Sequence, residues 1–119
     1  MTAELFVYGT LAPGEVSWPL FAPHVVEFRP NAAPGVLYDT RRGYPGALFG
    51  PGTELVHGWS CTITDPPGKA LEMLDAFEGD EYERIIVRCC DGTEALTYHW
   101  IATLDGLVPM RGGNWSMAR

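Results

Sequence analysis

Only one segment of this 119-residue chain is amphipathic at the period of an α-helix, and this restricts the fold more than any other feature. The segment covers residues 66–78. Asp65 suits the N-cap, Pro66 or Pro67 suits the first helical position, and Gly79 suits the position just past the end. The side chains predicted to share one side of this helix are Leu71, Leu74 and Phe77 or Glu78, flanked by Ala70 and Met73.

The rest of the chain is predicted to form strands and turns, because glycine and proline interrupt it throughout. Together these residues make up about 20% of the chain, against a usual value of roughly 12%. Asp91-Gly92, between two apolar runs, is a strong hairpin signal. We predict a brief helix at residues 17–21, ended by Pro23, and strands at residues 5–8, 36–38, 47–49, 55–63, 85–90 and 95–102.

The order of these elements indicates the α+β class, with a small sheet or barrel that carries a minority of helix. No repeat, low-complexity tract or linker divides the chain, so we expect a single domain over residues 1–119. Residues 109–119 are expected to be irregular. Alternation predicts that one face of the strand at residues 55–63 carries Leu55, His57, Trp59, Cys61 and Ile63.

Charge and composition exclude several classes of partner. Eight basic and fifteen acidic residues give a net charge of −7, and no stretch concentrates lysine or arginine, so we expect no nucleic-acid partner. No apolar run is long enough for a signal peptide or a membrane span. The cysteines are odd in number and two are adjacent, which favours reduced thiols and a cytoplasmic location.

The first candidate site is the segment Tyr8-Gly9-Thr10-Leu11, which directly follows a predicted buried strand. A backbone that turns sharply at Gly9 can point successive N–H groups into one concavity, and such a nest binds a carboxylate or phosphate. A plain strand end with glycine as its turn residue explains the same four residues. Local physics alone favours the plain turn, because a four-residue pattern is weak.

The second candidate is Glu78, at the end of the predicted helix. An acid there opposes the helix dipole, so Glu78 does not stabilise the helix. It follows Leu74 by four residues and can therefore lie at the edge of the buried face. Desolvation would raise its pKa toward neutrality, which suits a proton-transferring group. One more solvated glutamate in an acidic stretch is the alternative interpretation.

Other reactive side chains have simpler structural interpretations. The three histidines lack the spacing of metal ligands, so no metal site is predicted. The three cysteines lie in strand-like runs, where core packing is the simplest role. Arg84 is expected to pair with a neighbouring acid. Four tyrosines can line a pocket, donate to an oxyanion or fill the wall of a barrel, namely Tyr38, Tyr44, Tyr82 and Tyr98.

Five short motifs follow one another in a specific order. The first is Phe6-Val7-Tyr8-Gly9-Thr10-Leu11, and the last is Leu74-Asp75-x-x-Glu78-Gly79-x-x-Tyr82-x-Arg84. Between them lie Gly35-x-Leu37-Tyr38, Gly43-Tyr44-Pro45-Gly46-Ala47 and Val56-His57-Gly58-Trp59. In this order, over residues 5 to about 100, the motifs resemble the γ-glutamylcyclotransferase-like family, in particular its short, bacterial-type AIG2-like members. Residues 109–119 lie outside this resemblance.

The resemblance implies a small mixed β-barrel with a minority of flanking helices around one pocket. In enzymes of the family, main-chain groups at the positions of Gly9, Thr10 and Leu11 hold the α-amino acid end of the substrate. The glutamate at the position of Glu78 is the catalytic acid/base. Tyr8, Tyr44 and Tyr82 complete the substrate-binding set that we expect in this chain.

The implied reaction is an intramolecular attack of the substrate α-amine on its own γ-carbonyl, which releases 5-oxoproline and an amine. It needs no metal and no cofactor. Two alternatives are a sibling enzyme that removes a γ-glutamyl protecting group from a biosynthetic intermediate, and a non-catalytic module that binds a small amino-acid derivative. The leaving amine is expected to depend on how residues 41–46 and 109–119 close the pocket mouth.

Overall fold

The computed structural model describes residues 2–64 and 68–116. Two short helices and a 3₁₀ turn, η1 (Ala22–His24), accompany seven strands in this part of the chain. The elements are β1 (Thr2–Val7), α1 (Trp18–Phe21), β2 (Val25–Asp39), β3 (Pro45–Phe49), β4 (Leu55–Thr64), α2 (Lys69–Glu78), β5 (Tyr82–Arg88), β6 (Glu94–Trp100) and β7 (Val108–Pro109).

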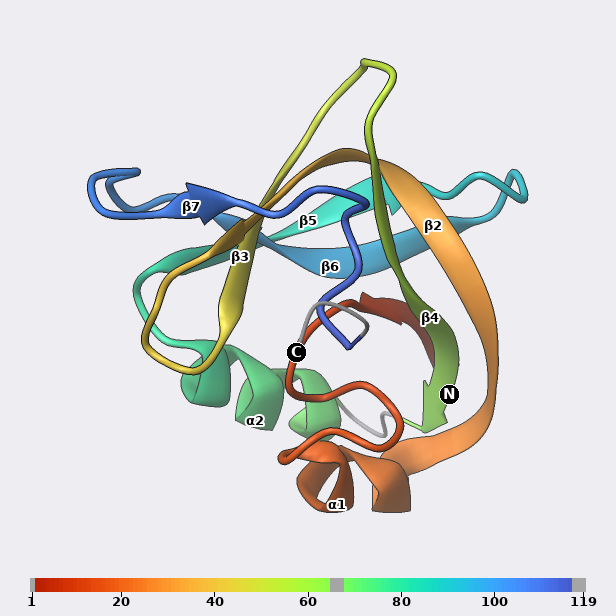
Figure 1. Cartoon of the computed structure of the whole chain (residues 1–119). Helices are drawn as coiled ribbons and strands as arrows, with labels where there is room; N and C mark the ends of the chain where they lie inside the picture. Colours follow the sequence, from red (N-terminus) through yellow and green to blue (C-terminus); the bar gives the residue numbers. More distant parts are fainter. Residues whose placement is uncertain (1, 65–67, 117–119) are drawn as a thin grey trace.

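The strands form one mixed sheet in the order β3-β2-β4-β1-β6-β5, with β7 paired to β2. β1 and β6 run parallel, whereas the other pairs are antiparallel. Two hydrogen bonds draw the ends of the sheet together. Cys90 N–H donates to the Ala32 carbonyl at 2.8 Å, and Phe49 N–H donates to His99 Nδ1 at 3.1 Å. The result is the nearly closed barrel of Figure 1, which confirms the predicted fold class.

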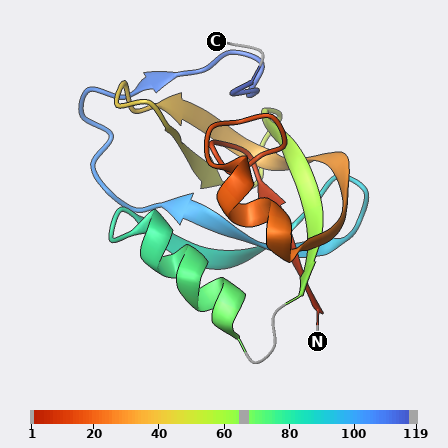
Figure 2. The same cartoon turned by 90° about the horizontal axis from the view of Figure 1, so that it is seen from below.

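β1 separates two cores, because successive side chains of a strand point to opposite faces. Leu5 and Val7 pack in a core that also contains Phe21 of α1 and Leu74 of α2, so this core lies between the sheet and the helices. Figure 2 shows both helices on that side of the sheet. The second core fills the barrel and contains Phe6, Tyr8, Ala33, Leu37, Ala47, Val56, Val87, Cys89, Ala95 and Trp115.

β2 is one strand of 15 residues, although its sequence predicts only a short strand at residues 36–38. The difference arises because β2 changes partner along its length. Residues 25–34 pair with β4, and residues 35–39 pair with β3. Pro30 and Pro34 lie in the part of β2 whose strand partner is β4. Proline is tolerated in a strand that pairs on one edge, because its missing N–H donor can then be on the unpaired edge.

The predicted face of β4 is buried at one end only. Cys61 and Ile63 are fully buried in the core beneath the helices, whereas Leu55 and His57 are exposed. Val56, on the opposite face, is fully buried inside the barrel. The core beneath the helices therefore covers this face from the partly buried Trp59 to Ile63, and not at Leu55 and His57.

The tail is an integral part of the barrel, although its sequence predicts only irregular structure. Met110 N–H donates to the Leu37 carbonyl at 2.8 Å, and His57 N–H donates to the Gly113 carbonyl at 2.8 Å. Trp115 is 4% exposed and packs in the barrel core. The tail thus closes the end of the barrel beside β2 and β4.

α2 confirms the predicted stop at Gly79, whose φ of 77° is in the left-handed region that glycine favours. The helix begins at Lys69, after Gly68 with a φ of 92°. Asp65, Pro66 and Pro67, predicted as the cap and first turn, lie outside the described residues. Ala70 and Leu74 are buried as expected, but Phe77 is 42% exposed and does not belong to the core.

Packing in the barrel wall leaves no room for a side chain at Gly46, so a methyl group there should lower the stability of the fold. A Cβ there would lie 2.7 Å from the ring of Trp100, which is 2% exposed and donates its Nε1–H to the Thr103 carbonyl. We expect Gly46→Ala to lower the free energy of unfolding by about 1–3 kcal/mol through overpacking, measured by urea denaturation. Gly50→Ala, where a Cβ meets no atom within 4 Å, should change it by less than about 0.5 kcal/mol. Equal effects of the two substitutions would contradict the packing argument.

Candidate active site

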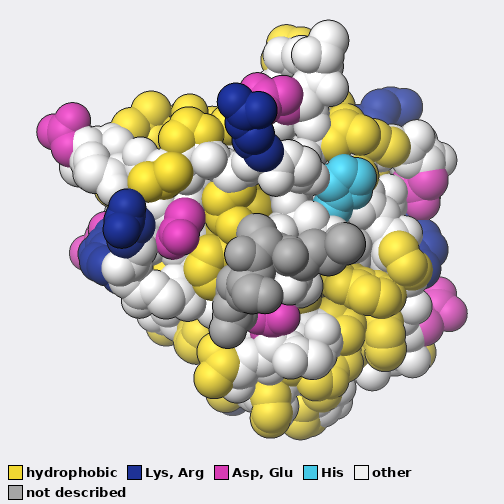
Figure 3. Space-filling model, viewed as in Figure 1, with side chains coloured by type: hydrophobic (Ala, Val, Ile, Leu, Met, Phe, Trp, Pro, Cys, Tyr) yellow, Lys and Arg dark blue, Asp and Glu magenta, His cyan; other side chains and the backbone are white. Residues whose placement is uncertain are grey.

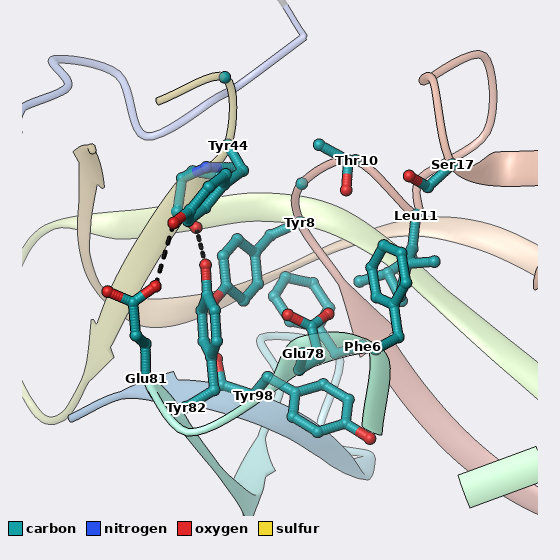
Figure 4. Close-up of a pocket in the computed structure, with 15 residues that line it drawn as sticks. Phe6, Tyr8, Thr10, Leu11, Ser17, Tyr44, Glu78, Glu81, Tyr82 and Tyr98 are labelled. Atoms are coloured by element: carbon teal, nitrogen blue, oxygen red, sulfur yellow. Dashed lines mark hydrogen bonds between the residues drawn. The ribbon is translucent and has the colours of Figure 1, made fainter. Parts of the chain in front are cut away.

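A cavity of about 350 Å³ opens between the end of α2, the loop after β1 and the loop before β3 (Figure 4). The structure brings all seven of the predicted site residues to its walls: Tyr8, Gly9, Thr10, Leu11, Tyr44, Glu78 and Tyr82. The neighbouring lining residues include Phe6, Ser17, Pro45, Phe77, Glu81 and Tyr98. Of the two segments expected to close its mouth, residues 43–45 line the cavity, whereas no residue of the described tail does.

Glu78 continues the buried stripe of α2, because it follows Leu74 by one helical turn as Leu74 follows Ala70. Its side chain is half-buried and its carboxylate points into the cavity (Figure 4). Burial raises the pKa of Glu78 from its ordinary value to about 7. Within the described part of the chain, no hydrogen bond or ion pair compensates this carboxylate. A carboxyl group with a pKa in this range is suited to exchange a proton near neutral pH.

A second carboxylate, Glu81, lies on the same cavity and has the opposite electrostatic environment. Arg42 contacts it at 2.7 Å, and the Tyr44 hydroxyl donates to it at 3.0 Å. The hydrogen bond from Arg42 lowers the pKa of Glu81. The environments of the two acids thus shift their pKa values in opposite directions, down for Glu81 and up for Glu78. The sequence showed Glu81 only as one of several acids in an acidic stretch, and the Arg42 pairing had no local signal.

Protein acceptors hold the hydroxyls of four cavity tyrosines. Tyr8 donates to the Tyr98 carbonyl and Tyr82 to the Pro45 carbonyl, both at 2.6 Å. Tyr98 donates to Asp75 at 2.7 Å, and Tyr44 donates to Glu81. Burial is the main cause that raises the pKa of Tyr8, Tyr82 and Tyr98, and the hydrogen bond to Asp75 adds to it at Tyr98. These neutral, fixed rings form the cavity wall, which fits the structural interpretation of the tyrosines.

The loop after β1 lines the cavity with Gly9, Thr10 and Leu11. The carbonyls of Gly9 and Thr10 accept from Ala12 N–H at 3.0 Å and from Ser17 N–H at 2.8 Å. Among the described residues, the N–H groups of Gly9, Thr10 and Leu11 have no acceptor. Successive backbone N–H groups without an acceptor are the feature that an anion-binding nest uses.

Gly9 is required for a reason that the sequence did not indicate. It is absent from the positive-φ glycines, so it supplies no left-handed turn. A Cβ at Gly9 would instead lie 2.8 Å from Cγ of Pro45. The missing side chain lets the loop after β1 approach the loop before β3, so that both can line one cavity.

Thr40 fixes the second loop. This buried residue donates its hydroxyl to the Tyr44 carbonyl at 2.6 Å and its N–H to the same oxygen at 3.3 Å. The loop between them is thereby closed, and Tyr44 is held against the cavity with Arg42 stacked 5.1 Å from its ring centre. The position of Tyr44 therefore depends on a threonine that no motif included.

Several other side chains lie away from the cavity. Arg84 pairs with Asp75 at 3.1 Å, as predicted. Cys61 and Cys89 are buried as expected, but Cys90 is exposed. No group of three or more His, Cys, Asp or Glu side chains in residues 2–64 and 68–116 is arranged to hold a metal ion. None of the helices in these ranges is long and apolar enough to cross a membrane. Basic side chains are scattered on the face in Figure 3 and form no continuous patch there.

Known proteins show the same architecture. The crystal structure of YkqA from Bacillus subtilis matches with a TM-score of 0.77 and 24% identity, over 98% of this chain and 40% of that one. The chain therefore spans less than half of that protein. An AIG2-like protein from Mus musculus matches with a TM-score of 0.67 and 23% identity, over 82% of this chain and 76% of that one.

Sequence comparisons give the family. The γ-L-glutamyl-butirosin B γ-glutamyl cyclotransferase of Niallia circulans is 27% identical over 122 residues, which cover 98% of this chain and 77% of that protein. The family model described as gamma-glutamyl cyclotransferase, AIG2-like, matches residues 5–117. The match extends through the tail, beyond the resemblance seen in the motifs. The chain belongs to the AIG2-like γ-glutamyl cyclotransferase family.

Proposed function

We propose that this chain cyclises the γ-glutamyl group of a small amide, releasing 5-oxoproline and an amine, with Glu78 as general acid and base. The family and the cyclotransferase relative support an activity of this type. The observation that carries the assignment of Glu78 is its uncompensated carboxylate in the cavity, with a pKa raised to about 7. We further propose that residues 1–119 form one domain, that the reaction needs no cofactor, and that the protein acts in the cytoplasm.

The chemistry requires one proton to leave and one to return. The neutral α-amine of the substrate attacks the γ-carbonyl and gives one proton to Glu78 as the five-membered lactam closes. Glu78 returns the proton to the departing nitrogen as the amide bond breaks. A group with a pKa near 7 performs both transfers at neutral pH, because neither protonation state is strongly favoured.

Binding must also hold the γ-glutamyl group in a curled conformation. The free N–H groups of Gly9, Thr10 and Leu11 suit the α-carboxylate, which would place the α-amine inside the cavity with Glu78. The rings of Tyr44 and Tyr82 limit the space available to the extended chain. Orientation of this kind is a large part of the catalysis of any intramolecular reaction.

The relative from Niallia circulans favours a second candidate. Its name states that it is a γ-glutamyl cyclotransferase of γ-L-glutamyl-butirosin B. The same cavity in this chain could therefore remove a γ-glutamyl protecting group from a biosynthetic intermediate. The two candidate functions share the same cyclisation reaction. They differ in the leaving amine, which would lie near residues 43–45 at the cavity.

Substitution of Glu78 tests the assignment of the acid/base. We expect Glu78→Gln to reduce 5-oxoproline formation from a panel of γ-glutamyl amines, amino acids and amides by about 10²-fold or more, because glutamine cannot transfer the proton. Glu72→Gln, an exposed position on the same helix, is the matched control and should retain activity. Equal rates for the native chain and Glu78→Gln would remove Glu78 from the mechanism. Saturable binding without turnover of any compound would favour a non-catalytic module.

The raised pKa of Glu78 predicts a pH dependence of both rate and stability. The rate should rise with pH through about 7 as the base form appears, measured as kcat/KM. Because the folded pKa lies above the unfolded value, the folded state binds more protons between pH 4.5 and 7, and stability falls as pH rises across this window. Urea unfolding should therefore show a larger stability advantage of Glu78→Gln over the native chain at pH 8 than at pH 5. An advantage that does not change with pH would contradict the buried carboxylate.

A further inference from the structure

Ser17 has a side chain that its local structure does not use. It occupies the N-cap of α1, where a serine hydroxyl ordinarily accepts from a backbone N–H, but it makes no capping hydrogen bond. No other partner of this hydroxyl exists among the described residues. Ser17 lines the cavity, and in Figure 4 its oxygen is directed toward the interior beside Thr10, with Glu78 on the other side.

Ser17 belongs to the same turn as the free backbone donors. Its N–H donates to the Thr10 carbonyl at 2.8 Å, which fixes Ser17 against the loop after β1. The hydroxyl of Thr10 also lacks a partner within residues 2–64 and 68–116. Two hydroxyls and three N–H groups without an acceptor among the described residues therefore belong to residues that line the cavity, and each of them is a hydrogen-bond donor.

The charges around the cavity explain why such donors would be needed. No lysine, arginine or histidine is among the described residues that line it. Arg42, nearby on the loop before β3, is bound to Glu81. A cation inside the cavity would favour the ionised form of Glu78 and lower its pKa. Neutral donors can hold a carboxylate without making Glu78 a weaker base.

We propose that Ser17 donates a hydrogen bond to the α-carboxylate of the γ-glutamyl group and so selects γ-glutamyl over γ-aminobutyryl compounds. The identity of this ligand rests on the proposed function, whereas the anion-binding role of Ser17 rests on the geometry of the cavity. The Ser17 hydroxyl adds one more uncharged donor to a binding site for the substrate carboxylate. This site lies on the cavity wall across from Glu78. Ser17 is thus a specificity-determining residue that takes no part in proton transfer.

Binding of two products that differ by one carboxylate tests the proposal. 5-Oxoproline carries the carboxylate and 2-pyrrolidinone lacks it, and ligand-observed NMR measures the affinity of each. We expect Ser17→Ala to weaken 5-oxoproline binding about tenfold or more, as for a lost hydrogen bond to a charged group, with 2-pyrrolidinone binding unchanged. Ser17→Thr keeps the hydroxyl and should retain most of the affinity. Thr53→Ala removes a hydroxyl from an exposed loop and is the control.

Equal binding of 5-oxoproline by the native chain and Ser17→Ala would overturn the proposal, as would an equal loss for both ligands. Lack of 5-oxoproline binding by the native chain would overturn it too. Thermal melting of Ser17→Ala should match the native chain, because the hydroxyl caps nothing. In turnover, the same variant should raise KM and leave kcat within about twofold. Selective loss of 5-oxoproline binding in a chain without turnover would support Ser17 and reject the cyclotransferase proposal, so the two can fail separately.

Discussion

The position of β1 between β4 and β6 is the constraint on which the rest of the structure depends. Its alternate side chains supply both cores, one beneath the helices and one inside the barrel. Its end delivers Tyr8 and the donor loop to the cavity, and the core on its helix side anchors α2 through Leu74. The positions of both walls of the candidate site therefore depend on one six-residue strand.

The cavity isolates one carboxylate from every compensating charge. Arg42 neutralises Glu81, Arg84 pairs with Asp75, and the tyrosine hydroxyls donate elsewhere. What remains is an acid without a partner among the described residues, facing a wall of neutral donors. Such an arrangement costs stability when the acid is ionised, and a site of proton transfer is where that cost is useful.

Short-range patterns predicted the elements whose causes are local. Turn preferences predicted the hairpin at Asp91-Gly92, and cap preferences predicted the end of the helix at Gly79. The helical period predicted that Glu78 lies on the same side of α2 as Leu74. Long-range contacts were invisible. Three features each depend on a neighbour far away in sequence: the docking of the tail on β2 and β4, the continuous β2 through Pro30 and Pro34, and the need for glycine at position 9. The Arg42–Glu81 pair, 39 residues apart, is missed for the same reason.

The parallel pairing of β1 with β6 has a consequence for how the chain folds. Phe6 accepts from Thr97 across 91 residues, and Trp115 fills the barrel only after the tail has docked. Contacts at such separation are entropically expensive to close before they stabilise anything, so the barrel should assemble slowly relative to helical domains of this size. The β5–β6 hairpin is the most local unit of the sheet and is the natural place for its nucleus. The candidate site, which needs both β1 and α2, would then be among the last features of the molecule to form.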